Sequence, residues 1–317
     1  MKAIVQDRYG SPDGLQLREI DKPIVGDDCV LVRVRAASVN AADWHLMRRL
    51  PHLIALLLGR RASRIRGGDM AGVVEAIGKS VTRFKPGDEV FGVGRGTFAE
   101  YATASEDHLV PKPRNLTFEQ AAAIPGAGCT ALQGLRDKAH VQPGQRVLVY
   151  GAGGGVGTFA VQIAKSLGAH VTAVTSTTNV GLVRSIGADE VIDYTTEDFT
   201  ERGQRYDVLF DIGANRSFAD CRRVLAPNGT LLLVGAPSGL WAQLSRVLMA
   251  QLSREGSKRI AYIARIRRED LVVLKELVEA GKLSPVIDRQ YRLNEVPDAL
   301  RYLGARHARG KVVINVA

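Results

Sequence analysis

The sequence predicts an α/β protein that combines a β-rich domain with a domain built on a doubly wound parallel sheet. The chain has 317 residues, a length that suits two domains better than one core. Its N-terminal third contains short Val- and Ile-rich runs separated by turn sequences. Further along, apolar runs alternate with helical patterns, which is typical of a parallel sheet covered on both faces.

The N-terminal strands are predicted from five runs: AIVQD, LQLREI, CVLVRVRAAS, AGVVEAIG and DEVFGV. Turn sequences such as GSPDG and FKPGD separate them. Strands at this spacing predict a small barrel or sandwich. A leucine- and arginine-rich insert from Leu46 to Arg66, expected to be helical, interrupts the series.

An Ala-rich helical stretch begins near Phe118, and strands then alternate with helices. The predicted strands of this part are QRVLVY, HVTAVTS, EVIDY, DVLFDIG, GTLLLVG and KRIAYIA. The C-terminal tail, which ends in KVVINVA, mixes helices with strands and is expected to return to the first domain.

The glycine-rich turn after Tyr150 carries the strongest functional signal, because it joins a buried strand to a helix. Glycines let backbone N–H groups approach a pyrophosphate, and the helix N-terminus adds unpaired N–H groups and a positive dipole end. The turn therefore predicts a Rossmann dinucleotide site, with a purely structural turn as the alternative. The predicted contacts are Gly153, Gly154, Gly155, Val156 and Gly157.

The residues after the second strand of this unit bear on the choice of cofactor. An NAD site normally has Asp or Glu there, to hold the ribose 2′-OH. This chain has Ser176, Thr177 and Thr178 instead. Small hydroxyls admit a 2′-phosphate that a carboxylate would repel, so NADPH is predicted, with NADH as the alternative. The same residues would equally suit a helix cap.

Charge and cysteine content exclude several classes of protein. The net charge of +10 would suit nucleic acid, a membrane surface or an anionic ligand, but no RNP-like or zinc-finger pattern accompanies it, so nucleic acid is not expected. The three cysteines are far apart, which argues against a disulfide framework and a structural zinc lobe. With no apolar signal region and no run of about 20 apolar residues, a cytoplasmic protein is expected.

The stretch SVNAADWH places Asn40, Asp43 and His45 at the end of a predicted strand. Catalytic zinc needs about three protein ligands and a water, which Asp43 and His45 do not supply. The Asn–Asp pair would equally cap a helix that starts near Ala42.

Taken together, VNAADWHLMR, GDMAGVVEAIG, FKPGDEVFGV, GGVGTFAVQIAKSLGA and ARGKVVI resemble the zinc-free, quinone oxidoreductase-like branch of the medium-chain dehydrogenase/reductase superfamily. The resemblance covers nearly the whole chain. It implies a GroES-like catalytic domain at 1–122 and 267–317, a Rossmann domain at 123–266, an active cleft between them, and a homodimer.

The resemblance also implies roles for single residues. Zinc-dependent members have Cys at the position of Asn40 and His–Glu at Gly68–Asp69, so no zinc is expected. Asn40 and Asp43 are implied to be catalytic. Lys311 is implied to reach the cofactor or, alternatively, to be a solvated surface lysine. Thr178 replaces an arginine that close relatives often have, which weakens the case for strict NADPH use. The further implied cofactor contacts are Thr130, Tyr194, Gly213 and Gly235.

The predicted activity is hydride transfer from NADPH to a small hydrophobic quinone or α,β-unsaturated carbonyl. Such acceptors delocalise the incoming charge, so a donor such as the Asn40 amide suffices where a plain aldehyde needs a Lewis acid. The alternatives are a zinc-dependent alcohol dehydrogenase and an NADPH-binding sensor or interaction protein with little turnover. Segments 46–66 and 240–260 are candidates for a lid, an interface or peripheral membrane contact.

Overall fold

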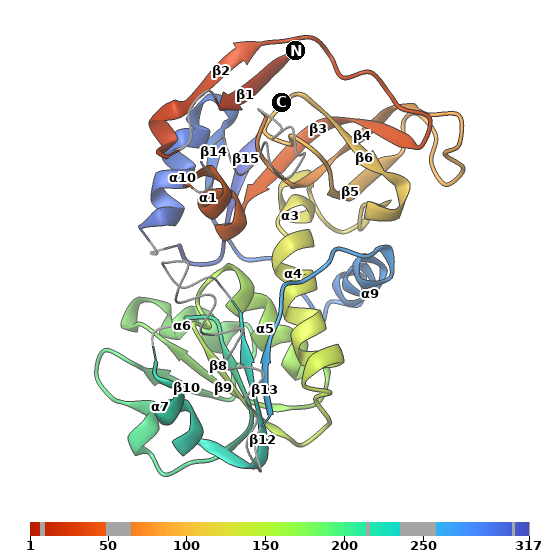
Figure 1. The fold of residues 1–317 in the computed structure, drawn as a ribbon. Helices are drawn as coiled ribbons and strands as arrows, with labels where there is room; N and C mark the ends of the chain where they lie inside the picture. The colour runs from red at the N-terminus through yellow and green to blue at the C-terminus, as the bar shows by residue number, and fades with distance from the viewer. Residues whose placement is uncertain (7–9, 49–64, 214–215, 235–257, 306–307, 317) are drawn as a thin grey trace. The chain divides into compact units, whose positions relative to one another are not determined.

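The computed structural model describes residues 1–6, 10–48, 65–213, 216–234, 258–305 and 308–316 (Figure 1). The chain forms two compact units. Unit 1 comprises Met1–Cys129, Ile266–Gly281 and Pro285–Ala317, and unit 2 comprises Thr130–Arg265 and Lys282–Ser284. The domain boundaries expected from the sequence stay a prediction.

Unit 1 is rich in strands. Its strands are β1 Lys2–Gln6, β2 Leu15–Glu19, β3 Cys29–Val39, β4 Asp69–Ile77, β5 Glu89–Val93, β6 Tyr101–Ser105, β7 Leu109–Pro111, β14 Ile287–Arg292 and β15 Lys311–Asn315. Its α-helices are α1 Ala41–Arg48, α3 Phe118–Ala122, α9 Arg268–Glu279 and α10 Val296–Gly304, together with the start of α4 Pro125–Leu132. Its short 3-10 helices are Pro12–Gly14, Glu106–His108 and Leu293–Glu295.

The larger sheet of unit 1 has the strand order β14-β15-β3-β4-β5-β7, and β6 also pairs with β3. Strand β15 pairs antiparallel with β3, so the last strand of the chain lies in the same sheet as the N-terminal strands. The register places Val39 opposite Val312 and Ser38 opposite Asp69. The sheet thus brings the end of β3 beside the starts of β4 and β15.

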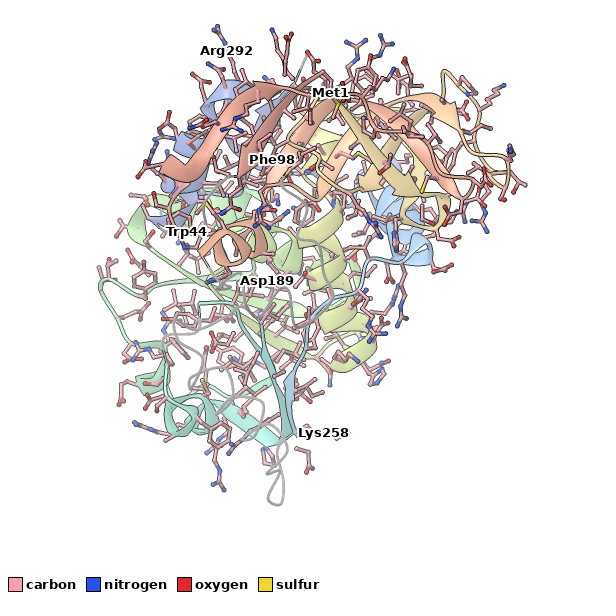
Figure 2. The ribbon with its side chains drawn as sticks, turned by 45° about the horizontal axis from the view of Figure 1, so that its top comes forward. Met1, Trp44, Phe98, Asp189, Lys258 and Arg292 are labelled. Atoms are coloured by element: carbon pink, nitrogen blue, oxygen red, sulfur yellow. The ribbon has the colours of Figure 1, made fainter. Side chains whose placement is uncertain are left out.

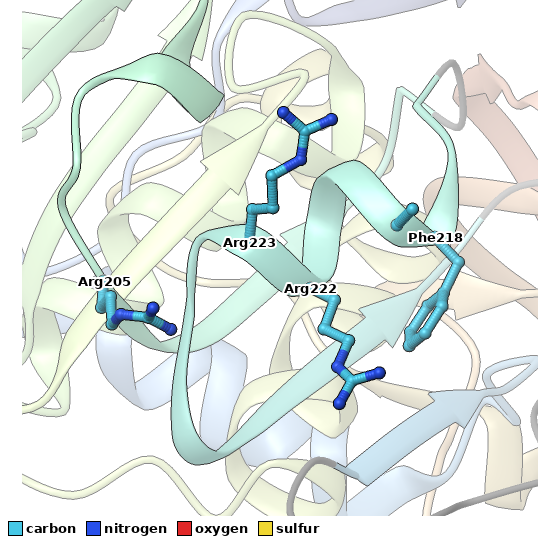
Figure 3. Close-up of a pocket in the computed structure, with 5 residues that line it drawn as sticks. Arg205, Phe218, Arg222 and Arg223 are labelled. Atoms are coloured by element: carbon cyan, nitrogen blue, oxygen red, sulfur yellow. The ribbon is translucent and has the colours of Figure 1, made fainter.

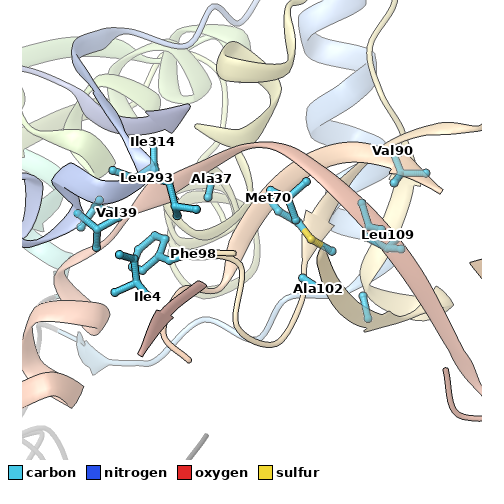
Figure 4. Packing of buried hydrophobic residues seen from close by; sticks show 14 of the residues in the cluster. Ile4, Ala37, Val39, Met70, Val90, Phe98, Ala102, Leu109, Leu293 and Ile314 are labelled. Carbon is cyan, nitrogen blue, oxygen red and sulfur yellow. The ribbon is translucent and has the colours of Figure 1, made fainter. Parts of the chain in front are cut away.

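The core of unit 1 lies against this sheet. Phe98, Met70 and Ile4 are completely buried there, together with Ile314 from the C-terminal strand (Figure 4). Each such side chain contributes about 1.5–3 kcal/mol through burial of its apolar surface. Charged side chains such as Arg292 and Lys258 are exposed and point outward from their own units (Figure 2).

Unit 2 contains a six-stranded parallel sheet in the order β10-β9-β8-β11-β12-β13. The order reverses between β8 and β11, which is where doubly wound sheets bind ligands. Its strands are β8 Arg146–Tyr150, β9 His170–Thr175, β10 Glu190–Asp193, β11 Tyr206–Asp211, β12 Leu225–Leu233 and β13 Lys258–Ala261. Its helices are α5 Gly155–Ser166, α6 Val180–Ser185 and α7 Phe218–Arg223, with the π-helix Gln133–Lys138 and the 3-10 helices Thr177–Asn179 and Phe199–Glu201.

Every predicted strand of both units is present, but some details differ. The Ala-rich stretch is two helices, because Pro125 lacks an N–H and starts the second one. Among the helices that alternate with these strands, α7 is short: it ends at Arg223, and β12 begins at Leu225. Strands β6 and β7 were not predicted, since their short sequences carry little pattern.

The bulk of the 46–66 and 240–260 segments, and the predicted contact Gly235, lie outside the described residues. Within the described ranges, no helix has both the length and the apolar character needed to cross a bilayer.

Candidate active site and cofactor site

A buried polar cluster lies where β3 ends and β4 and β15 begin. Its centre is Asp69, which is 3% exposed. One oxygen of this carboxylate, Oδ2, accepts hydrogen bonds from Ser38 Oγ at 3.1 Å, Asn40 Nδ2 at 2.9 Å and the Gly126 backbone N–H at 3.0 Å. Such a convergence of donors satisfies a buried carboxylate that would otherwise be costly.

Lys311, the first residue of β15, belongs to the same cluster. Its Nζ donates to Asn40 Oδ1 at 2.5 Å and to the Val39 carbonyl at 3.4 Å, and lies 3.9 Å from Asp69 Oδ2. The residue is only 3% exposed. Burial lowers the pKa of its ammonium group, while the carboxylates of Asp69 and Asp43 oppose that shift. The alternative of a solvated surface lysine is therefore wrong, because the register of β15 on β3 carries this side chain inward.

Asn40 and Asp43 are linked at the start of α1. The Asp43 carboxylate accepts the Asn40 backbone N–H at 2.8 Å, and the Asn40 carbonyl accepts the Asp43 N–H at 3.0 Å. Asp43 therefore does act on the helix terminus, as the capping alternative anticipated. The Asn40 side chain, in contrast, donates to Asp69 and accepts from Lys311.

Burial raises the pKa of Asp43 to about 7; its hydrogen bond from Asn40 opposes the shift and Asp69 adds to it. An unfolded aspartate titrates near 4, so between about pH 4 and 7 the folded protein holds a proton that the unfolded chain has lost. Stability is therefore expected to fall as pH rises through this window. Asp43→Asn should flatten the dependence and be the more stable protein at pH 8, as measured by urea unfolding across pH. An unchanged slope in the variant would contradict the assignment.

Two residues of the cluster, Asn40 and Asp69, occupy positions where, according to the resemblance, zinc-dependent members have Cys and Glu. Here an amide and a carboxylate, Asn40 and Asp69, stand 2.9 Å apart and bond to each other. In the part of the chain that the structure describes, no three His, Cys, Asp or Glu side chains group so that they could hold a metal ion. His45 lies half-buried on α1.

In unit 2, the glycine turn between β8 and α5 has the shape that a dinucleotide needs. Gly151 has a φ of +91°, which other residues rarely adopt. A Cβ on Gly157 would lie 2.2 Å from the Gly151 carbonyl oxygen, and one on Gly153 would lie 2.7 Å from Asn179 Nδ2. Gly154 precedes α5 without a side-chain cap, so the first amides of the helix are left for a ligand. These residues fit a bound pyrophosphate.

The hydroxyls predicted to lie near the ribose follow β9. Parallel pairing sets Asp193 of β10 opposite Thr175 of β9, and the Tyr194 N–H donates to the Thr175 carbonyl at 3.0 Å. The structure thus brings Tyr194, 49% exposed, beside the segment 176–178. Thr177 Oγ1 is 2.8 Å from Thr195 Oγ1, and Ser176 Oγ is 3.2 Å from Thr178 Oγ1.

Asp193 was missed by the sequence reasoning. Its carboxylate accepts from the Thr195 N–H at 2.9 Å and Thr195 Oγ1 at 2.7 Å, and hydrogen bonds from Thr177 and Thr195 lower its pKa. In a Rossmann unit the acid that binds the ribose normally stands at the end of the second strand. Asp193 instead stands at the end of the third strand, β10, which pairs in parallel with β9. The EVIDY sequence, which ends this strand with an acid, could have indicated it.

The remaining predicted contacts belong to other elements of the two units. Gly213 donates its N–H to the Tyr150 carbonyl at 3.2 Å, and its backbone nitrogen would lie 3.1 Å from a Cβ on Gly151, so the ends of β8 and β11 meet. Thr130 lies in α4, where its carbonyl accepts the Tyr262 hydroxyl at 2.6 Å. Lys311 belongs to the cluster of unit 1.

A hollow of about 460 Å³ on unit 2 contains none of the predicted residues (Figure 3). Arg205, Phe218, Arg222 and Arg223 line it. Arg223 pairs with Asp220 at 2.8 Å, and Arg205 donates to the Leu225 carbonyl at 2.9 Å. Because no residue of the glycine turn lines this hollow, we do not place the dinucleotide there.

Comparison with known proteins places these features in a family. Residues 26–114 match the family described as "Alcohol dehydrogenase GroES-like domain", and residues 186–314 match the one described as "Zinc-binding dehydrogenase". The "Chloroplast envelope quinone oxidoreductase homolog" of Arabidopsis thaliana is 32% identical, over 99% of this chain and 98% of the relative. The "NADPH-dependent alkenal/one oxidoreductase, chloroplastic" of the same plant is 34% identical, over 99% of this chain and 79% of the relative.

A solved structure agrees with the sequence relatives. The quinone oxidoreductase from Coxiella burnetii superposes with a TM-score of 0.89 at 31% identity, covering 100% of this chain and 99% of that one. The predicted fold class, a GroES-like domain plus a Rossmann domain, is confirmed. The chain thus belongs to the medium-chain dehydrogenase/reductase superfamily, in its quinone oxidoreductase-like branch.

Proposed function

We propose that this protein transfers a hydride from NADPH to a quinone or an α,β-unsaturated carbonyl without a metal ion. The observation that carries the proposal is the similarity, over nearly the whole chain, to relatives named as quinone and alkenal/one oxidoreductases. The glycine turn supports a dinucleotide, whose nicotinamide supplies the hydride. The polar cluster supports handling of the acceptor by an amide rather than by a metal.

The chain's own residues divide the work. The amides at the start of α5 hold the pyrophosphate, and Gly153 and Gly157 allow the turn and α5 to pack closely enough to present those amides. Asn40 donates a hydrogen bond to the acceptor oxygen where negative charge develops. Asp43 holds the Asn40 backbone in place. Beyond the turn, the cofactor contacts that we propose are Thr130, Ser176, Thr177, Thr178, Tyr194, Gly213 and Gly235.

NADPH remains our proposed cofactor, because the hydroxyls of Ser176, Thr177 and Thr178 leave room for a 2′-phosphate. The Asp193 carboxylate beside Thr177 acts in the opposite sense, since a negative charge repels a phosphate. We therefore expect NADPH to be preferred by a modest factor, with NADH also used. Removing the charge in Asp193→Asn should increase that preference.

The test is an assay of the chelator-treated protein with NADPH and NADH against a quinone, an enone and a simple aldehyde. We expect turnover with quinone or enone, none with the aldehyde, and no effect of added zinc. Reduction of the aldehyde alone, restored by zinc, would favour an alcohol dehydrogenase. Tight NADPH binding without oxidation by any acceptor would favour the sensor alternative.

We also propose that the protein is a cytoplasmic homodimer, with a catalytic domain at 1–122 and 267–317 and a cofactor domain at 123–266. The mass in light scattering would contradict the dimer if it matched one chain. Cell fractionation tests the location, and flotation with anionic vesicles at low salt tests peripheral membrane contact.

A further inference from the structure

Among the four side chains of the buried cluster in unit 1, one is partly exposed. Ser38, Asp69 and Lys311 are 0%, 3% and 3% exposed, whereas Asn40 keeps part of its surface accessible. Lysine is almost never fully buried unless it is paired. The Asn40 side chain is therefore bonded on its buried side. Lys311 and Asp69 contact it directly, and Ser38 bonds to Asp69.

The partners of Asn40 determine which way its amide points. A carboxylate only accepts and an ammonium only donates. Asn40 Nδ2 must therefore face Asp69 Oδ2, at 2.9 Å, and Oδ1 must face Lys311 Nζ, at 2.5 Å. The reversed amide would set oxygen against oxygen and nitrogen against nitrogen.

In this arrangement the Asn40 carbonyl and one of its two Nδ2–H groups are hydrogen bonded, and the second Nδ2–H is not. Among the described residues, no group accepts from that second Nδ2–H. Because the amide is planar, fixing Oδ1 and the first N–H also fixes the direction of the second. The ammonium at Oδ1 in addition withdraws electron density from the amide, which strengthens the remaining N–H as a donor.

We propose that Lys311 is a positioning residue, which acts with Asp69 to hold the Asn40 amide so that its second N–H is presented to the acceptor oxygen. This inference rests on the proposed function. Lys311 itself makes no contact with the acceptor. It supplies preorganisation, because a donor already fixed in place needs no reorientation when charge develops.

The position of Lys311 supports a role in holding the Asn40 amide better than a role that is limited to neutralising the charge of Asp69. Its Nζ is closer to Asn40 Oδ1, at 2.5 Å, than to Asp69 Oδ2, at 3.9 Å. An ammonium that served only to neutralise Asp69 would be expected within about 3 Å of it. Its shortest bond is to the amide instead.

The kinetic test is a double-mutant cycle of Lys311→Met and Asn40→Ala. We expect Lys311→Met to lower kcat about 10- to 100-fold, with KM and NADPH affinity changed less than about threefold. In the Asn40→Ala background the lysine change should then have little further effect on kcat. Lys275→Met is the matched control, since Lys275 pairs with Glu279 at 2.7 Å elsewhere in unit 1. Effects that multiply in the double variant would overturn the proposal.

A second measurement does not depend on turnover or on the variant folding. In the wild-type protein, NMR of the Asn40 side-chain amide should show that the hydrogen bonded to Asp69 lies downfield of its partner and exchanges slowly with water. Two hydrogens with the shifts and the fast exchange of a solvent-exposed asparagine would overturn the proposal. If the wild type reduced neither quinones nor enones, the proposed function would fail, while these signals would still decide whether Lys311 and Asp69 hold the amide.

Discussion

Gly157→Ala is expected to abolish NADPH binding and to destabilise unit 2. A Cβ at this position would lie 2.2 Å from the Gly151 carbonyl oxygen and 2.7 Å from the Ala152 carbonyl carbon. Both are backbone atoms of the turn, so helix α5 would have to move away from β8. Overpacking typically costs about 1–3 kcal/mol, and a clash with backbone belongs at the upper end of that range or above it. Urea unfolding and a fluorescence titration with NADPH measure the two effects.

The control for this substitution is Gly181→Ala in helix α6. A Cβ there would meet no atom within 4 Å. Alanine in a helix is favoured over glycine by about 0.5–1 kcal/mol, so this variant should be slightly more stable and should bind NADPH normally. A Gly157→Ala protein with wild-type stability and wild-type affinity for NADPH would show that the turn is not packed as described.

Asp69→Ala is expected to be the most destabilising single change in the polar cluster. It removes the acceptor of three hydrogen bonds, from Ser38, Asn40 and Gly126. It also leaves the ammonium of Lys311 buried without its ion-pair partner. Breaking a buried pair in this way costs about 3–5 kcal/mol. The free energy of unfolding from urea titrations measures the loss.

Asp298→Ala is the control for the Asp69 variant. Asp298 also pairs with a cation, Arg301 at 2.5 Å, but its side chain is 64% exposed. Removing an exposed ion pair costs about 0–1 kcal/mol. If the two variants lost similar free energies of unfolding, the three hydrogen bonds to Asp69 would contribute less to stability than their geometry indicates.

Local patterns explain why the Rossmann unit could be predicted almost completely. A continuous apolar strand, a glycine turn and an amphipathic helix lie within about two dozen residues, and each is determined by the chemistry of its own stretch. The strands that escaped prediction, β6 and β7, are short and lack such a pattern. Their pairing partners β3 and β5 define them more than their own sequences do.

The sequence placed Asn40 and Asp43 at the candidate site, but Asp69 was considered only as the replacement of a zinc ligand, and Lys311 was expected to reach the cofactor or, alternatively, to be solvated. Strand register decides the matter: one residue of slippage would turn each side chain to the other face. Lys311 and Asn40 are 271 residues apart in the chain. The pairing of β15 with β3 cannot be predicted from the sequence of either strand alone.

By itself, then, the sequence determined the two kinds of domain, the glycine turn between β8 and α5, and the family, because these depend on residue patterns within single segments. The tertiary structure alone decided which side chains meet. In it, Lys311 is buried and bonds to Asn40, and three donors bond to Asp69. Asp193 lies beside the hydroxyls that follow β9. The physical reason is that a hydrogen bond depends on positions to within a few tenths of an ångström, and only the packing of whole sheets sets such positions for residues that are distant in the chain.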